Sequence, residues 1–157
     1  QQVVDSMQDE ILDSQNSETV HQLVVFQLGE ESFGIDIFRV NEIIRLKEIT
    51  PLPGTESHVK GLINLRGKTI PVIDLRLRLG MPAKDSTEAS RIIVVTVSRE
   101  NIGVIVDAVT EVLNLSQGEL QPTPDLVSEV NTEFIWSLAR RHDKILTLLN
   151  LDQAIAA

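Results

Sequence analysis

Short apolar runs separated by polar turns follow one another along the chain from residue 23 onward. Residues 23–28 and 33–37 predict the two strands of one hairpin, and residues 62–65 and 69–75 predict a second hairpin. A short helical turn is expected after the second hairpin, ending at Gly80. Valine, isoleucine and leucine dominate these runs, and branched side chains of this kind favour strands. The pattern therefore predicts an all-β fold.

The N-terminal segment, residues 1–21, has a different character. It is polar and acidic, and it is rich in Gln, Asp and Ser. Val4, Met7 and Ile11 fall at the spacing of one helix face, which permits a short amphipathic helix. We expect a flexible or weakly helical tail here, followed by one folded unit over residues 22–157.

The folded unit contains an internal repeat. When the sequence is shifted by 69 residues, residues 23–46 lie over residues 92–115 without a gap. The identical pairs in this alignment are Val25–Val94, Glu31–Glu100, Gly34–Gly103, Val40–Val109, Glu42–Glu111 and Leu46–Leu115. Further on, residues 68–75 lie over residues 144–151 at a shift of 76. The shift grows only in predicted loops, as expected if insertions accumulated there.

This repeat predicts a tandem duplication of a five-stranded unit of roughly 65–70 residues. One such unit would bury little of its surface alone, so we expect two units to share a hydrophobic core, with a groove between them. The predicted fold is thus two five-stranded barrels of the SH3-like or OB-like kind. The first barrel is placed at about residues 22–90 and the second at about residues 91–157, with exchange of strands between them left open.

Composition and charge narrow the classes of partner. The chain has 157 residues, of which 42% are hydrophobic and only 3% aromatic, and its formal net charge is −9. Charge of this sign repels phosphate groups, so nucleic acid and anionic membrane surfaces are poor partners. The apolar runs are too short to span a bilayer, and the N-terminus shows no secretory-signal pattern. We therefore expect a cytoplasmic protein.

A search for catalytic chemistry returns no candidate. Cysteine is absent, and the three histidines are scattered without metal-ligand spacing. The glycines are dispersed, and neither a phosphate-binding loop nor a nucleophile elbow is present. Asp36 and Asp107 could form a carboxylate pair, but solvated strand ends are the simpler interpretation. The sequence predicts no catalytic residue, no metal site and no cofactor.

Two features could serve a binding surface. Arg66 and Gly67 lie at the turn of the second predicted hairpin, where the planar guanidinium could bind a partner's carboxylate. A solvated turn arginine is the alternative. The other feature is an apolar stripe in each repeat, which either belongs to the core or lines the groove between the barrels: Val40, Ile43 and Ile44 with Val109, Val112 and Leu113.

Three segments resemble the CheW family of bacterial chemotaxis coupling proteins. They are LVVFQLGEESFGIDIFRVNEI at residues 23–43, VKGLINLRGKTIPVIDLRLRLG at residues 59–80 and GVIVDAVTEVL at residues 103–113. The resemblance implies the double barrel and an adaptor without enzymatic activity. It further implies two partners: the regulatory domain of the histidine kinase CheA, and the cytoplasmic tips of methyl-accepting chemotaxis receptors. Such an adaptor would be recruited through receptor arrays to the inner face of the membrane, without inserting into it.

The resemblance also assigns roles to individual positions. The residues it places toward the receptor are Val40, Glu42, Arg66, Val109 and Val112. The residues it assigns to shaping the backbone are Gly34, Gly61, Gly67 and Gly103. Ser137 departs from the family pattern, because related sequences often carry glycine there, so the local turn is expected to differ.

Other functions remain as alternatives. Within the same fold, the chain could be the regulatory domain of a CheA-type kinase, although the kinase's catalytic and dimerisation segments are absent from this sequence. A CheV-like coupler would need an additional receiver domain. An OB-type nucleic-acid-binding module is disfavoured by the net charge and by the scarcity of aromatic side chains. We expect a free-standing coupler.

Overall fold

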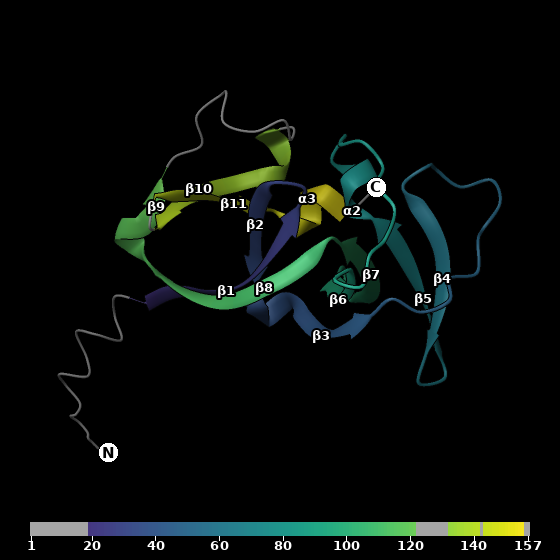
Figure 1. The fold of residues 1–157 in the computed structure, drawn as a ribbon. Coiled ribbons are helices and arrows are strands. Elements are labelled where there is room, and N and C mark those ends of the chain that lie inside the picture. Colours follow the sequence, from purple (N-terminus) through teal and green to yellow (C-terminus); the bar gives the residue numbers. More distant parts are fainter. Residues whose placement is uncertain (1–18, 122–131, 142, 156–157) are drawn as a thin grey trace, which may run out of the picture.

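The computed structural model describes residues 19–121, 132–141 and 143–155. In this part of the chain, strands dominate and helices are short (Figure 1). The strands are β1 (Thr19–Leu28), β2 (Glu31–Asp36), β3 (Val40–Arg45), β4 (Val59–Leu65), β5 (Lys68–Asp74), β6 (Arg91–Val97), β7 (Glu100–Val106), β8 (Ala108–Ser116), β9 (Leu120–Gln121), β10 (Ile135–Arg141) and β11 (Lys144–Leu149). The helices are η1 (Ile37–Arg39), α2 (Leu75–Arg78), η2 (Gln117–Glu119), η3 (Thr132–Phe134) and α3 (Leu151–Ile155). The predicted all-β class is confirmed.

The strands form two sheets, and each sheet combines strands from both repeats. The order is β8-β1-β2-β11-β10-β9 in the six-stranded sheet and β3-β6-β7-β5-β4 in the five-stranded sheet. The first hairpin of each repeat thus joins the later strands of the other repeat. In Figure 1, the purple β1 lies beside the green β8. The boundary expected near residue 90 separates the repeats in sequence, but it does not separate the two sheets.

The strand registers confirm the duplication. In the parallel pair of β2 and β11, Gly34 lies opposite Leu148. In the parallel pair of β7 and β5, Gly103 lies opposite Val72. These pairs correspond to each other at the shifts of 69 and 76 residues found in the sequence. The two sheets are therefore built on one plan, with the repeats exchanged between them.

The six-stranded sheet has one strand more than predicted. Its extra strand β9 spans only two residues, and within it Gln121 pairs with Leu138. The corresponding pairing in the other sheet is an isolated bridge between Thr50 and Leu62. The same closing contact is thus extended by one residue pair in one sheet, which accounts for the difference from two five-stranded barrels.

The first strand begins earlier than expected. β1 starts at Thr19 and pairs with β8 as far as Ser116, so residues 19–21 belong to the fold and not to the tail. The end of β8 offers backbone groups that need hydrogen-bond partners, and a longer β1 supplies them. The rest of the predicted tail, residues 1–18, lies outside the described residues.

Alternating side chains divide the interior into three clusters. One face of β1 and β2 packs between the two sheets with Phe26 and Phe33, whose rings stack 5.7 Å apart. This cluster is the predicted shared core. The opposite face of β1 fills the interior of the six-stranded sheet around Leu23 and Leu115. A matching cluster around Ile92 fills the five-stranded sheet, so each sheet is curled around its own apolar interior.

Candidate partner-binding site

Arg66 lies at the tip of the hairpin formed by β4 and β5, as predicted. It adopts a left-handed backbone conformation with φ of 51°, and Gly67 follows with φ of 82°. The Gly67 N–H donates to the Asn64 side-chain oxygen at 3.2 Å, which closes the tight turn. This conformation places the Arg66 side chain outside the barrel, where it is largely exposed.

The Arg66 guanidinium forms an ion pair with the Glu42 carboxylate on β3. β3 and β4 stand at opposite ends of the strand order, so only closure of the sheet into a barrel can bring them together. The bridge from Thr50 to Leu62, with N–O distances of 2.8 and 2.9 Å, makes this closure. Two residues expected to face a receptor thus lie together. The guanidinium, expected to point into the inter-barrel groove, binds Glu42 of the same barrel.

The three valines of the predicted site differ in exposure. Val40 and Val109 occupy corresponding positions, are half-buried and pack against the shared core. Val112, by contrast, is 52% exposed. Its counterpart in the first repeat is Ile43, which is 39% exposed. Val112 and Ile43 are therefore the apolar side chains of the stripe that a partner can reach most readily. The resemblance had not assigned Ile43 a role.

Gly61 has a strict steric reason to be glycine. Its φ is 145°, and a Cβ atom added there would lie 2.0 Å from the backbone oxygen of Thr50. Since Thr50 makes the closing bridge, a side chain at residue 61 would push the barrel open. Ser137 corresponds to Gly61 in the second repeat, where it is buried and its φ is not positive. The backbone thus differs at this position, as the departure from the family pattern predicted.

Gly103 and Gly34 are constrained by packing. A Cβ atom at Gly103 would lie 2.9 Å from a methyl group of Ile92 and 3.2 Å from one of Val72. At Gly34, the nearest atom would be a methyl group of Leu148 at 3.1 Å. In both sheets, the glycine lets the parallel strand pair approach closely beneath the barrel core.

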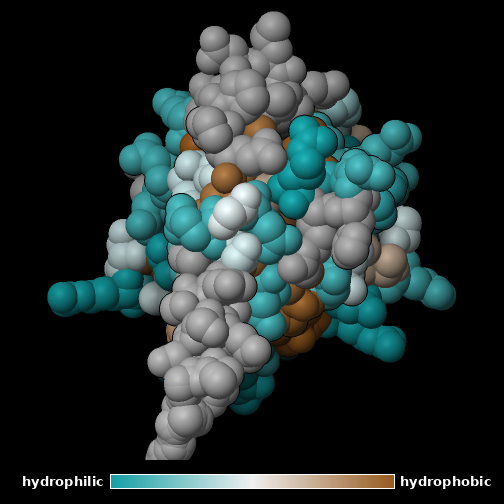
Figure 2. Space-filling view, turned by 90° about the vertical axis from the view of Figure 1, so that its left-hand side faces the viewer, coloured by the Kyte–Doolittle hydropathy of each residue, from teal (hydrophilic) through white to brown (hydrophobic). Residues whose placement is uncertain are grey.

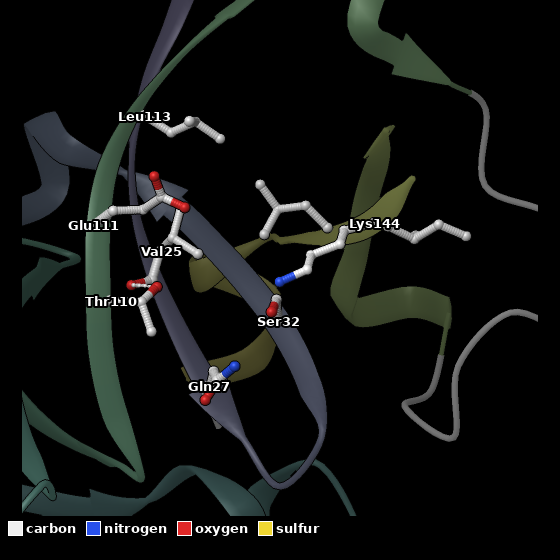
Figure 3. Close-up of a pocket in the computed structure, with 9 residues that line it drawn as sticks. Val25, Gln27, Ser32, Thr110, Glu111, Leu113 and Lys144 are labelled. Carbon is white, nitrogen blue, oxygen red and sulfur yellow. Dashed lines mark hydrogen bonds between the residues drawn. The ribbon is translucent and has the colours of Figure 1, made fainter. Parts of the chain in front are cut away.

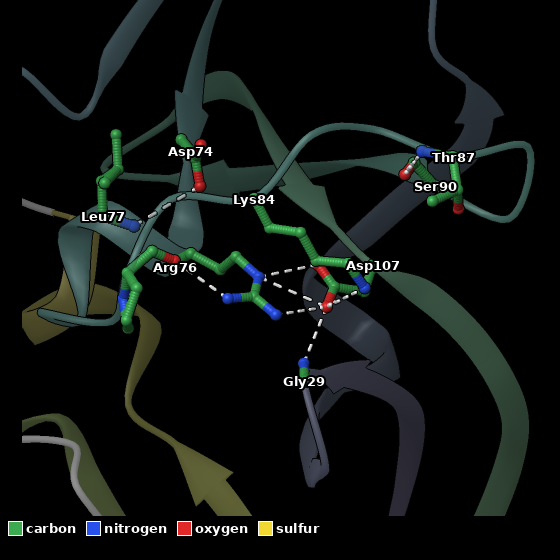
Figure 4. A network of polar contacts seen from close by, with 9 residues as sticks. Gly29, Asp74, Arg76, Leu77, Lys84, Thr87, Ser90 and Asp107 are labelled. Atoms are coloured by element: carbon green, nitrogen blue, oxygen red, sulfur yellow. Dashed lines mark hydrogen bonds and ion pairs between the residues drawn. The ribbon is translucent and has the colours of Figure 1, made fainter.

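A network around Arg76 and Asp107 was missed by sequence analysis (Figure 4). The Arg76 side chain donates to the Asp107 carboxylate at 2.8 to 3.3 Å and to the Pro82 carbonyl at 2.9 Å. The Gly29 N–H donates to the same carboxylate at 2.7 Å. Asp107 is therefore not a solvated strand end, and Asp36 instead accepts from the Phe38 N–H at 3.0 Å. The two aspartates do not form a catalytic pair.

The electrostatics of Asp107 follow from these contacts. Burial raises the pKa of its carboxyl group, but hydrogen bonds from Arg76 and Gly29 lower it. The positive charges of Arg76 and Lys84 lower it further, and the net result is a pKa below the ordinary value for aspartate. The network joins α2, the turn after β1 and the junction of β7 with β8. It links the two sheets and is a structural element.

Within the described residues, no group of three or more His, Asp or Glu side chains could hold a metal ion. In the same residues, no helix is long and apolar enough to cross a membrane. The face near β9 is mostly hydrophilic, and its hydrophobic side chains appear only in small separate patches (Figure 2). The features that stand out are thus surface contacts between side chains from distant strands.

Residues 22–157 match the family described as the CheW-like domain. The chain belongs to the CheW family. It is 36% identical over 131 residues to the chemotaxis protein CheW of Rhizobium meliloti (strain 1021), covering 83% of this chain and 84% of the relative. It is 32% identical over 141 residues to the CheW protein of Klebsiella aerogenes, covering 89% of this chain and 85% of the relative.

A solved CheW structure has the same fold. It is the crystal structure of the scaffolding protein TtCheW from Thermoanaerobacter tengcongensis, which is 39% identical in sequence. The TM-score is 0.80, and the alignment covers 87% of this chain and 93% of the other. These similarities confirm the family inferred from the three sequence segments, and with it a role as an adaptor in chemotaxis.

Proposed function

We propose that this chain is a non-catalytic scaffold that couples the CheA histidine kinase to the cytoplasmic tips of methyl-accepting chemotaxis receptors. The observation that carries the proposal is the likeness, over most of both chains, to a protein described as a scaffold. The proposed location is the cytoplasm, at the inner face of the membrane where the receptor tips lie. The proposed kinase contact is the CheA regulatory domain.

The receptor contact is proposed on the surface around the Glu42–Arg66 pair. Arg66 has a side chain that is 71% exposed, so a partner can reach its unused N–H groups while Glu42 holds one of them. An arginine bound in this way has less side-chain freedom to lose when it meets a receptor carboxylate. Val112 and Ile43 add exposed apolar surface in the two repeats. Charged and apolar contacts of this kind are typical of a non-obligate protein interface.

A binding assay with both partners tests the proposal. The chain, the isolated CheA regulatory domain and a receptor cytoplasmic fragment are mixed in pairs and together, and complexes are measured by gel filtration and calorimetry. We expect binding to each partner and a ternary complex in which neither displaces the other. Failure to bind either one at about 50 µM would contradict the proposal.

A further inference from the structure

A pocket of about 310 Å³ opens into the six-stranded barrel between β1, β2, β8 and β11 (Figure 3). Its apolar side consists of Val25, Leu113 and Leu146, which belong to the cluster inside that barrel. Its polar side chains come from four strands: Gln27, Ser32, Thr110, Glu111 and Lys144. Apolar walls with a few convergent polar groups are typical of a ligand site. No role has been given to this pocket so far.

The internal repeat provides a reference for the pocket. Glu111 lies opposite Val25 in the six-stranded sheet, and Glu42 lies opposite Val94 in the five-stranded sheet. The two glutamates are thus equivalent positions of one duplicated fold. Glu42 is bound by an arginine of the same chain. Within the described residues, Glu111 accepts no hydrogen bond and forms no ion pair.

The polar neighbours of the two glutamates also differ. In the five-stranded barrel, the Asn41 amide donates to Thr96 at 2.9 Å and to Asn101 at 2.8 Å, so these three side chains satisfy one another. The corresponding residues in the six-stranded barrel are Thr110, Gln27 and Ser32. Thr110 turns its hydroxyl to a backbone oxygen at 3.2 Å. Within the described residues, the other two side chains make no hydrogen bond and remain available to a ligand.

The sequence explains why the second glutamate has no arginine of its own. At the shift of 76 residues, the position of Arg66 corresponds to His142, which lies outside the described residues. Histidine has neither the permanent charge nor the planar fork of arginine. Lys144 corresponds to Lys68, so a lysine at this place is compatible with an arginine bound to the glutamate. Figure 3 shows Lys144 reaching toward Ser32, away from Glu111.

We infer that this pocket binds an arginine side chain presented by a partner protein, with the guanidinium on Glu111. The bound side chain lies as Arg66 lies on Glu42 in the other barrel. Its methylene groups cover Val25 and Leu113, and its remaining N–H groups reach the oxygens of Gln27 and Ser32. Arginine suits this combination because it joins an apolar stem to a planar donor fork. The net charge of −9 further favours a cationic group.

Nuclear magnetic resonance with N-acetyl-argininamide tests the pocket directly on the full chain. We expect saturable shifts of the amide signals of Gln27, Ser32, Glu111 and Lys144, with a dissociation constant of roughly 1 mM for a ligand of this size. The citrulline analogue has the same shape without the charge, and the lysine analogue has the charge without the fork. Both are expected to bind more weakly.

Paired variants separate the pocket from general charge effects. Glu111→Gln should weaken N-acetyl-argininamide binding by at least about threefold. Glu100→Gln removes the same charge from an exposed residue of β7 that does not line the pocket, and should leave the affinity unchanged. Arg66→Ala should create a second site, with new shifts around Glu42. Equal binding of the citrulline analogue, or no effect of Glu111→Gln, would overturn the inference.

The partner's contribution rests on the proposed scaffold function and is tested separately. In the binding assay with CheA regulatory domain and receptor fragment, Glu111→Arg should weaken binding of one partner by about tenfold, whereas Glu100→Arg should not. If Glu111→Arg leaves both affinities intact while the wild-type chain binds both partners, the partner arginine is refuted and the scaffold function stands. If the wild-type chain binds neither partner, the scaffold function falls, while the titration still decides whether the pocket binds arginine.

Discussion

Arg76 and Asp107 form an ion pair whose counterpart in the other repeat has the opposite polarity. Arg76 is the second residue of α2, and Asp152 is the second residue of α3. Asp107 comes directly before β8, and Arg39 comes directly before β3. Arg39 donates to Asp152 at 2.6 Å, so each helix is tied to the strand junction beside it. The duplication preserved the position of the contact but not the placement of its charges.

The two ion pairs should contribute unequally to stability. The side chains of Arg76 and Asp107 are 11% and 19% exposed, while Arg39 and Asp152 are 32% and 62% exposed. Asp107→Ala leaves the Arg76 charge largely buried without a partner, and should cost about 3 kcal/mol in the free energy of unfolding. Asp152→Ala serves as the control and should cost less than about 1 kcal/mol. Urea denaturation measures both, and equal losses would show that burial does not separate the pairs.

The Asp107 network also predicts how stability depends on pH. Because folding lowers the pKa of this carboxyl group, the contribution to stability is fully present above the unfolded-state value of about 3.9. It is lost as the pH falls below about 4 toward the lower folded-state pKa. Denaturation at pH 7 and at pH 3 should show a larger loss for the wild-type chain than for Asp107→Asn. Identical pH profiles would contradict the network's role.

Gly61 provides a test of barrel closure. In Gly61→Ala, the new Cβ atom meets the Thr50 carbonyl, and the backbone conformation also disfavours a side chain. We expect a loss of roughly 3 kcal/mol or more in unfolding free energy. Gly118→Ala is the control, since a Cβ atom there meets nothing within 4 Å and its φ is not positive. A stable Gly61→Ala protein would show that the closing bridge can shift at little cost.

The sequence predicted the strands and the repeat because both depend on local alternation and on regular spacing. The exchange of hairpins could not be predicted in this way. A first hairpin packed on its own repeat and one packed on the other repeat require the same apolar positions. Only the pairing of Val25 with Glu111, rather than with Glu42, distinguishes the two arrangements, and alternation carries no information about it. The duplication makes both pairings equally compatible with the sequence.

The site was predicted in part for a related reason. The tight turn at Arg66 is a local feature, so its conformation could be inferred from neighbouring residues. Its contact with Glu42 depends on closure of the barrel across 24 residues of sequence. The bond between Arg76 and Asp107 likewise joins residues 31 positions apart. The family resemblance indicated which positions were important, but it could not show which side chains would bind one another.

Arg66→Ala should separate partner binding from folding. The exposed pair with Glu42 is worth at most about 1 kcal/mol to the fold, so thermal melting should change little. If Arg66 contacts a receptor carboxylate, affinity for the receptor fragment should fall at least about tenfold, or roughly 1.4 kcal/mol, while CheA binding stays intact. Arg66→Lys should be intermediate, because lysine cannot make paired hydrogen bonds. Unchanged receptor affinity would identify Arg66 as a surface residue without a binding role.

A double-mutant cycle with Glu42 distinguishes direct contact from positioning. If Glu42 only orients Arg66, then Glu42→Gln should weaken receptor binding in the wild-type background and have no effect once Arg66 is alanine. If Glu42 contacts the receptor itself, the two losses should add. In the first case, the reversed pair Glu42→Arg with Arg66→Glu should restore the melting temperature but not receptor binding, because the guanidinium then lies on β3 instead of the hairpin tip. Restored receptor binding by the reversed pair would show that the receptor recognises the ion pair and not the position of Arg66.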